Sequence, residues 1–121
     1  MIIDTSGSVK RESLVDFFTE VRSIWRQGCE VTIIEADSLV RKTWEYRGQL
    51  QQAAKGGGGT KFDPALQWVA EASPSFDAAL YFTDGKAMAP TVAPGCDVLW
   101  VLTADGDTSS LGGQRTIKLA R

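Results

Sequence analysis

The first nine residues, MIIDTSGSV, place one carboxylate and three hydroxyls directly after an apolar run. Asp4, Ser6 and Ser8 form the pattern D-x-S-x-S within this stretch. Alternate residues of an extended segment point the same way, so we expect Asp4 and Ser6 to face one side and Ser8 to join them at the following turn. Carboxylate and hydroxyl oxygens are hard ligands, which suit magnesium, manganese or calcium. The stretch therefore predicts half of an oxygen-lined cation site.

Two later positions offer further oxygen ligands. Thr60 follows the glycine run at 56–59, whose backbone freedom allows its hydroxyl to come close to the first loop. Asp84 lies near the end of a strand-like run at 78–85, and its carboxylate is expected to reach the ion directly or through a water. Magnesium takes six oxygens and usually keeps some waters, so a shell with few protein charges stays electrophilic. The expected ligands of one divalent cation (Mg, or Mn or Ca) are Asp4, Ser6, Ser8, Thr60 and Asp84.

The composition removes several other chemistries. The chain of 121 residues contains no histidine, which excludes Ser-His-Asp and Cys-His catalysis and the usual zinc sites. The net charge of −2 gives no sign of a nucleic-acid surface, and no apolar run approaches the roughly 20 residues that span a bilayer. Cys29 and Cys96 lie far apart beside predicted strands, so we expect reduced, buried thiols and a cytoplasmic protein.

Strand-like and helix-like segments alternate along the chain. The strands are expected at 1–4, 30–36, 39–46, 78–85, 97–103 and 115–120, and the helices at 9–27 and 62–72. Residues 47–55 are polar and give no clear pattern. Alternation of this kind is typical of an α/β fold, and here it predicts a Rossmann-like open twisted sheet that is mostly parallel. The chain is expected to be a single domain over residues 1–121.

The connections predict the order of the strands. Only Asp37 and Ser38 separate the second and third strands, so these should form a tight antiparallel hairpin at one edge. Return through the second helix brings the fourth strand to the other side of the first, which gives the order 3-2-1-4-5-6. Ligands in open α/β sheets bind at the carboxyl ends of the strands where this order reverses. Asp4 and Asp84 should therefore meet at such a crevice.

At this point the residues resemble a known family. D-T-S-G-S, G-G-T and T-D-G, in that order, are similar to the metal-ion-dependent adhesion site (MIDAS) of von Willebrand factor A domains. The resemblance implies that Asp4, Ser6 and Ser8 are first-loop ligands, Thr60 the second-loop ligand and Asp84 the third. It also implies a cation-dependent protein-interaction module, in which an Asp or Glu of a partner completes the shell.

A narrower resemblance concerns GGGGTKFDPAL and the compact length. These features are similar to the A-like domain at the C-terminus of a group of predicted bacterial metallopeptidases. Peptidase activity would then belong to a separate preceding domain, and this chain, itself no enzyme, would be a fragment or the C-terminal part of a longer protein.

Other interpretations remain open at this stage. Asp4 and Ser8 are also suited to capping the helix that follows them. A magnesium-dependent phosphotransferase of the haloacid dehalogenase type also places an aspartate after its first strand. Such enzymes resemble the pattern D-x-D-x-T, and Ser6 stands here where their second acidic residue would be. A structural domain with a degenerate metal site is the third possibility.

The fifth strand raises a separate expectation. Residues 98–102 are apolar throughout, and parallel sheets are normally covered on both faces. The flanking segments at 86–95 and 104–113 look unable to form long helices. We therefore expect an exposed apolar patch near Trp100 in the isolated chain, unless a preceding domain, a dimer partner or the segment 47–55 covers this strand.

Overall fold

The computed structural model describes residues 1–48 and 58–119, and these contain six strands and two helices. Most of the ambiguous segment at 47–55 and the first half of the glycine run at 56–59 lie outside the described residues. The elements are β1 (Ile2–Asp4), α1 (Arg11–Trp25), β2 (Thr32–Ala36), β3 (Val40–Glu45), α2 (Asp63–Ala70), β4 (Ala78–Thr83), β5 (Asp97–Leu102) and β6 (Arg115–Lys118).

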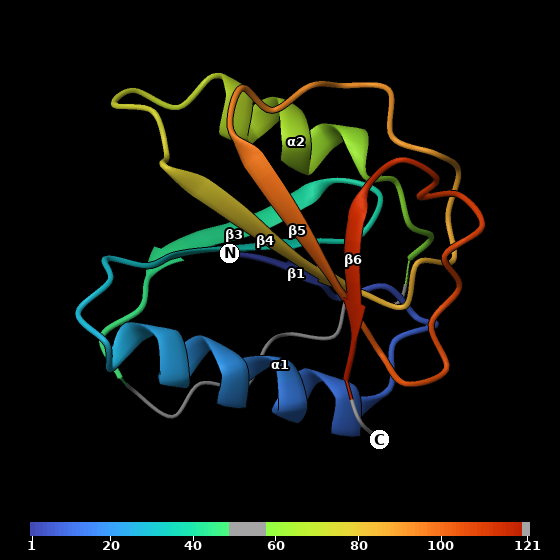
Figure 1. Ribbon diagram of the computed structural model, residues 1–121, viewed down its shortest axis with the longest axis horizontal. Helices are drawn as coiled ribbons and strands as arrows, with labels where there is room; N and C mark the ends of the chain where they lie inside the picture. Colours follow the sequence, from blue (N-terminus) through green and yellow to red (C-terminus); the bar gives the residue numbers. More distant parts are fainter. Residues whose placement is uncertain (49–57, 120–121) are drawn as a thin grey trace.

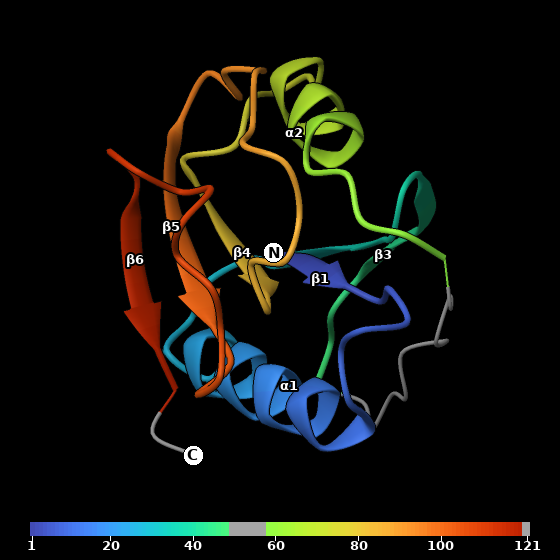
Figure 2. The ribbon, with the colours of Figure 1, turned by 90° about the vertical axis from the view of Figure 1, so that its right-hand side faces the viewer.

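The six strands form one sheet with the order β3-β2-β1-β4-β5-β6, which confirms the predicted order. β2 and β3 are antiparallel, and the other neighbouring pairs are parallel. Figure 2 shows β1 and β4 side by side in the middle of the sheet, between the edge strands β3 and β6. The carboxyl ends of these two central strands therefore share one edge, at the point where the strand order reverses.

Helix α1 covers one face of the sheet and α2 covers the other (Figure 1). On the α1 side, Leu14, Phe17 and Val21 are spaced three and four residues apart and are buried. The ring of Phe17 lies 5.2 Å, centroid to centroid, from that of Phe82 in β4. Burial of one such side chain stabilises a fold by about 1.5–3 kcal/mol, so this stripe holds α1 to the centre of the sheet.

Helix α1 is shorter than the range of 9–27 that the sequence predicts. It begins at Arg11 because the chain first makes a turn, in which the Val9 N–H donates to the Ser6 carbonyl oxygen at 3.1 Å. After its last turn, Gly28 has a φ of 95°. This left-handed conformation costs glycine little, so Gly28 allows the chain to turn away after the helix ends.

Three aromatic rings fill the core on the α2 side. Tyr81 of β4 stacks on Trp100 of β5 with centroids 4.6 Å apart, and Phe62 meets both rings edge-on at 5.3 and 4.9 Å. Phe62 immediately precedes α2, which spans Asp63–Ala70 rather than the predicted 62–72. Aromatic pairs in these geometries add to the stabilisation from area burial, so the start of α2 is held over strands β4 and β5.

Trp100 itself is not part of an exposed patch, because it is only 1% exposed, whereas Val98 and Leu99 at the start of the same strand are half-buried. The Trp100 indole N–H donates to Gln114 Oε1 at 3.2 Å. Segment 86–95 packs over the same face and is tied to α2 by Asp63, whose carboxylate accepts the backbone N–H and the hydroxyl of Thr91 at 2.8 and 2.5 Å. A loop can cover this face without forming a helix, because a carboxylate supplies hydrogen bonds for its backbone.

The cysteines also differ from expectation. Both are unpaired, as predicted, but Cys29 is exposed and Cys96 only half-buried, because they lie on the connections before β2 and β5 rather than within the strands. Within the part of the chain that the structure describes, no helix combines the length and the apolar character needed to cross a bilayer.

Candidate functional site

Asp4 joins the two central strands at their carboxyl ends. It is the last residue of β1 and is fully buried. Its Oδ1 accepts the backbone N–H of Ser6 at 2.9 Å, and its Oδ2 accepts the hydroxyl of Thr83 at 2.5 Å. Thr83 is the last residue of β4. A buried carboxylate thus fixes the first loop and the neighbouring strand to each other.

The two serines of the motif lie together in the first loop. The hydroxyl oxygens of Ser6 and Ser8 are 3.4 Å apart, with Ser6 buried and Ser8 exposed. Neither Asp4 nor Ser8 caps α1, because the N-cap residue of that helix is Lys10 and no side chain hydrogen-bonds to its free N–H groups. The capping interpretation is therefore wrong, and these side chains are available for another role.

Asp84 supplies a second buried carboxylate, directly after β4. The residue is 2% exposed, and its Oδ1 accepts the backbone N–H of Lys86 at 3.1 Å. Its Oδ2 is buried and has no hydrogen-bond partner among the described residues. A buried anionic oxygen without a partner is costly, since it loses its hydration and gains nothing in return. A bound cation would remove this cost.

The loop that presents Asp84 is held closely to the loop after β5. The Asp107 N–H donates to the carbonyl oxygen of Asp84 at 2.8 Å, and the Gly85 N–H donates to the Thr83 hydroxyl at 3.1 Å. Gly85 has a φ of 74°, and a Cβ atom there would lie 2.0 Å from the carbonyl oxygen of Asp107. Only glycine fits at this position, which fixes the direction of the backbone beside Asp84.

The segment that carries Thr60 lies against the first loop. The Gly7 N–H donates to the carbonyl oxygen of Gly58 at 3.1 Å, and the Lys61 N–H donates to that of Asp37 at 3.2 Å. Thr60 itself is half-buried. The structure thus brings all three segments of the expected site to one edge of the sheet, and backbone contacts join the second segment to the first.

The electrostatics favour a positive charge at this edge. Burial raises the pKa of Asp4, the hydrogen bonds from Ser6 and Thr83 lower it, and the charge of Asp84 raises it, with the net pKa above its ordinary value of 3.8. A like charge nearby disfavours the ionised form of a carboxyl group, here that of Asp4. A divalent cation at this edge would favour the charged form of Asp4 instead.

The donor set fits a hard cation only with the hydroxyls included. Among residues 1–48 and 58–119, no three His, Cys, Asp or Glu side chains are grouped so that they could hold a metal ion. The expected site contains only two carboxylates, Asp4 and Asp84, and takes its other ligands from hydroxyl oxygens. The buried, unpartnered oxygen of Asp84 is consistent with such a set.

Thr83 is a residue of this site that the sequence analysis missed. Its hydroxyl donates to Asp4 and accepts from Gly85, so it links the first and third loops. The triplet T-D-G contains it. The signal that could have found it is the parallel pairing of β1 with β4, which places a hydroxyl at the end of β4 near a carboxylate at the end of β1.

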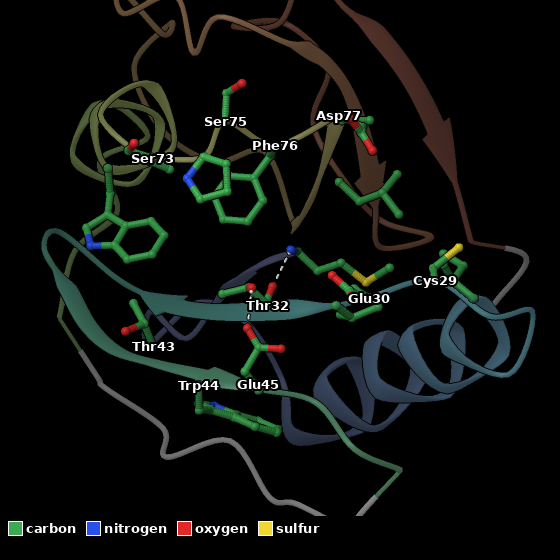
Figure 3. A pocket seen from close by; sticks show the side chains of 18 of the residues that line it. Cys29, Glu30, Thr32, Thr43, Trp44, Glu45, Ser73, Ser75, Phe76 and Asp77 are labelled. Atoms are coloured by element: carbon green, nitrogen blue, oxygen red, sulfur yellow. Dashed lines mark hydrogen bonds between the residues drawn. The ribbon is translucent and has the colours of Figure 1, made fainter.

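A separate cavity of about 1200 Å³ lies at the opposite edge, among the amino ends of the parallel strands (Figure 3). The Met1 amine reaches it and donates to the carbonyl oxygen of Thr32 at 2.6 Å, while Thr32 donates its hydroxyl to Glu45 at 2.9 Å. None of the five expected ligands lines this cavity. It therefore has no part in the predicted cation site.

The family follows from a comparison of the whole chain with family models. The model described as VWA-like domain (DUF2201) matches residues 1–119. The chain belongs to this family. Membership in the VWA-like family agrees with the six-stranded, mostly parallel sheet and with the placement of D-x-S-x-S directly after its central strand.

A protein of Thermotoga maritima, described as uncharacterized, is similar to this VWA-like chain. The two are 29% identical over 92 residues, which cover 74% of this chain and 23% of that protein. The VWA-like chain thus corresponds to about a quarter of the length of this relative. No solved structure matches the chain significantly.

The close contact at Gly85 leads to a first prediction. Gly85→Ala should destabilise the fold by at least about 3 kcal/mol, because it combines a left-handed φ with a clash against the Asp107 carbonyl. Gly95→Ala is the matched control, since Gly95 has a φ of 81° with nothing within 4 Å of the added Cβ; it should cost about 1–2 kcal/mol. Urea unfolding measures both, and equal losses would contradict the clash.

The raised pKa of Asp4 leads to a second prediction, for protein kept in EDTA. Wild-type Asp4 takes up a proton more readily in the folded than in the unfolded state, so its contribution to stability falls as pH rises from 3.8 through its folded pKa. The stability of Asp4→Asn relative to wild type should therefore rise as the pH is raised from acid to neutral, because the asparagine side chain does not titrate. Thermal unfolding from pH 3.5 to 7.5 measures it, and a pH-independent difference would refute this assignment of the pKa.

Proposed function

We propose that this VWA-like domain binds a partner protein through a divalent cation at the carboxyl ends of β1 and β4. The observation that carries the proposal is the buried Oδ2 of Asp84, which has no partner among the described residues and belongs to a carboxylate whose charge acts on Asp4. A fold rarely leaves such an oxygen uncompensated, so an unexplained one indicates a ligand.

Five residues would hold the cation. Asp4 and Asp84 supply the negative charge, and Ser6, Ser8 and Thr60 supply neutral oxygens. Thr83 would orient Asp4, since its hydroxyl donates a hydrogen bond to one of the two carboxylate oxygens. Orienting contacts of this kind are common around metal ligands.

The charge balance favours an acidic partner. Magnesium, or manganese or calcium in its place, would act at this site as a Lewis acid that attracts a further oxygen anion. With two carboxylates and neutral hydroxyls, the cation keeps an affinity for one more charged ligand. An Asp or Glu side chain of another protein fits that requirement, and we infer that the domain recognises such a side chain.

The wider context belongs to the same proposal. This chain corresponds to only 23% of the length of its Thermotoga maritima relative. We infer that it acts as the C-terminal A-like part of a longer cytoplasmic protein, with any peptidase activity in a preceding domain and no catalysis in this one. A preceding domain or a second copy could also cover the half-buried Val98 and Leu99 at the start of β5.

Magnesium binding is tested by thermal unfolding. At a magnesium concentration ten times the Kd, the cation should stabilise the wild type by about 1.4 kcal/mol, which raises the Tm of a domain of this size by roughly 5 °C. Asp84→Asn should abolish the rise because it removes one of the two charges at the site. Asp77→Asn, which removes an exposed carboxylate at the opposite edge, is the matched control and should keep the full rise.

The alternatives give different outcomes. If millimolar magnesium, manganese and calcium do not change the Tm of the wild type, the chain is a structural domain with a degenerate metal site. Magnesium-dependent hydrolysis of p-nitrophenyl phosphate that is lost in Asp4→Asn would instead indicate a phosphotransferase.

A further inference from the structure

A third buried carboxylate, Asp37, lies beside the candidate site in the turn between β2 and β3. The residue is 2% exposed, and its Oδ1 accepts the backbone N–H of Leu39 at 3.1 Å and the Nε of Arg41 at 2.8 Å. Burial raises the pKa of Asp37, but these hydrogen bonds and the Arg41 charge outweigh it and hold the pKa below its ordinary value of 3.8. The side chain is therefore charged and fixed in position.

The segment before Thr60 passes close to this carboxylate. A Cβ atom at Gly58 would be 3.1 Å from Asp37 Oδ2, which is tighter than ordinary van der Waals contact. On the other side, the Gly58 carbonyl oxygen accepts the Gly7 N–H of the first loop. Just beyond Thr60, the Lys61 N–H donates to the Asp37 carbonyl oxygen at 3.2 Å. Asp37 thus binds the second loop just after Thr60 and lies close to it just before Thr60.

We propose that Asp37 is a positioning residue for the cation site: its buried carboxylate leaves no room for a side chain at position 58, and its backbone carbonyl holds the Lys61 N–H, so that together they set the place of Thr60 beside the first loop. The inference rests on the proposed function and deepens it. Among the described residues, Asp37 forms no hydrogen bond with Asp4 or Asp84, so we expect it to act through the second loop. A larger residue at position 58 would have to shift either the Asp37 carboxylate, which is held by Leu39 and Arg41, or the loop by a few tenths of an ångström.

Two neighbouring glycines provide a matched pair for the test. Gly58→Ala adds a methyl group against Asp37, whereas Gly59→Ala adds one where nothing lies within 4 Å. Both substitutions replace glycine by alanine in the same segment, so they alter the flexibility of the unfolded chain alike. Gly58→Ala should weaken magnesium affinity about tenfold or more, as loss of orienting contacts around metal ligands does. Gly59→Ala should leave the affinity within about twofold of wild type, as measured by isothermal titration with magnesium chloride.

A double variant tests whether the effect passes through Asp37. Asp37→Ser shortens the side chain and should weaken magnesium binding on its own. If the added methyl group acts on the carboxylate, the two substitutions should not add. The double variant Gly58→Ala/Asp37→Ser should then bind magnesium no more weakly than whichever single variant binds it more weakly. Losses that multiply would show independent effects and overturn the proposal.

A readout without metal separates this inference from the proposed function. Hydrogen exchange by NMR in EDTA should show the Lys61 and Gly7 amides less protected in Gly58→Ala than in Gly59→Ala. Equal protection, or equal magnesium affinity of these two variants while the wild type binds, overturns the role of Asp37 and leaves the proposed function intact. A wild type that binds no cation contradicts the proposed function instead, and with it any role of Asp37 in a cation site.

Discussion

Two carboxylates end the central strands of this sheet, and both are removed from water. Asp4 is stabilised by the Ser6 N–H and the Thr83 hydroxyl, so its burial ties β1, the first loop and β4 together. Asp84 has a partner on only one of its oxygens among the described residues. Because burial of charge is costly unless it is compensated, the carboxyl edge of the sheet depends on how these two groups are satisfied.

The loops around them are arranged to keep the carboxylates in place. Gly85 lets the backbone pass close to Asp107, and the resulting contact holds the loop after β4 to the loop after β5. Asp37 performs a similar task on the other side, where it binds its own hairpin and contacts the second loop. Rigid support of this kind is what a binding site needs, since poorly held ligands lose affinity.

The two faces of the sheet are covered by different means. Helix α1 provides a regular apolar stripe on one side. The other side combines the shorter α2 with segment 86–95, which Asp63 anchors through Thr91. This arrangement buries Trp100 within its own chain. The polar carboxyl edge can thus be supported by a small domain, because both faces beneath it are packed.

Much of this architecture can be read from local patterns. Alternating strands and helices and the short connection after Ala36 were enough to predict the sheet order, because strand period and hairpin length are properties of neighbouring residues. The connection has three residues, 37–39, rather than the two that the sequence predicts. The order in turn placed Asp4 and Asp84 at one edge. Helix ends were less accurate, as at Arg11, because a turn between Ser6 and Val9 competes with the first helical turn.

The sequence by itself determined the fold class, the strand order and the residue types available for chemistry. Tertiary structure decided the remaining points: the burial of Trp100 under a loop, the bond from Thr83 to Asp4, the unpartnered oxygen of Asp84 and the close approach of the chain at Gly58 to Asp37. Each of these depends on how segments far apart in the chain are placed. Local periodicity carries no information about such contacts, since they depend on how packed elements meet.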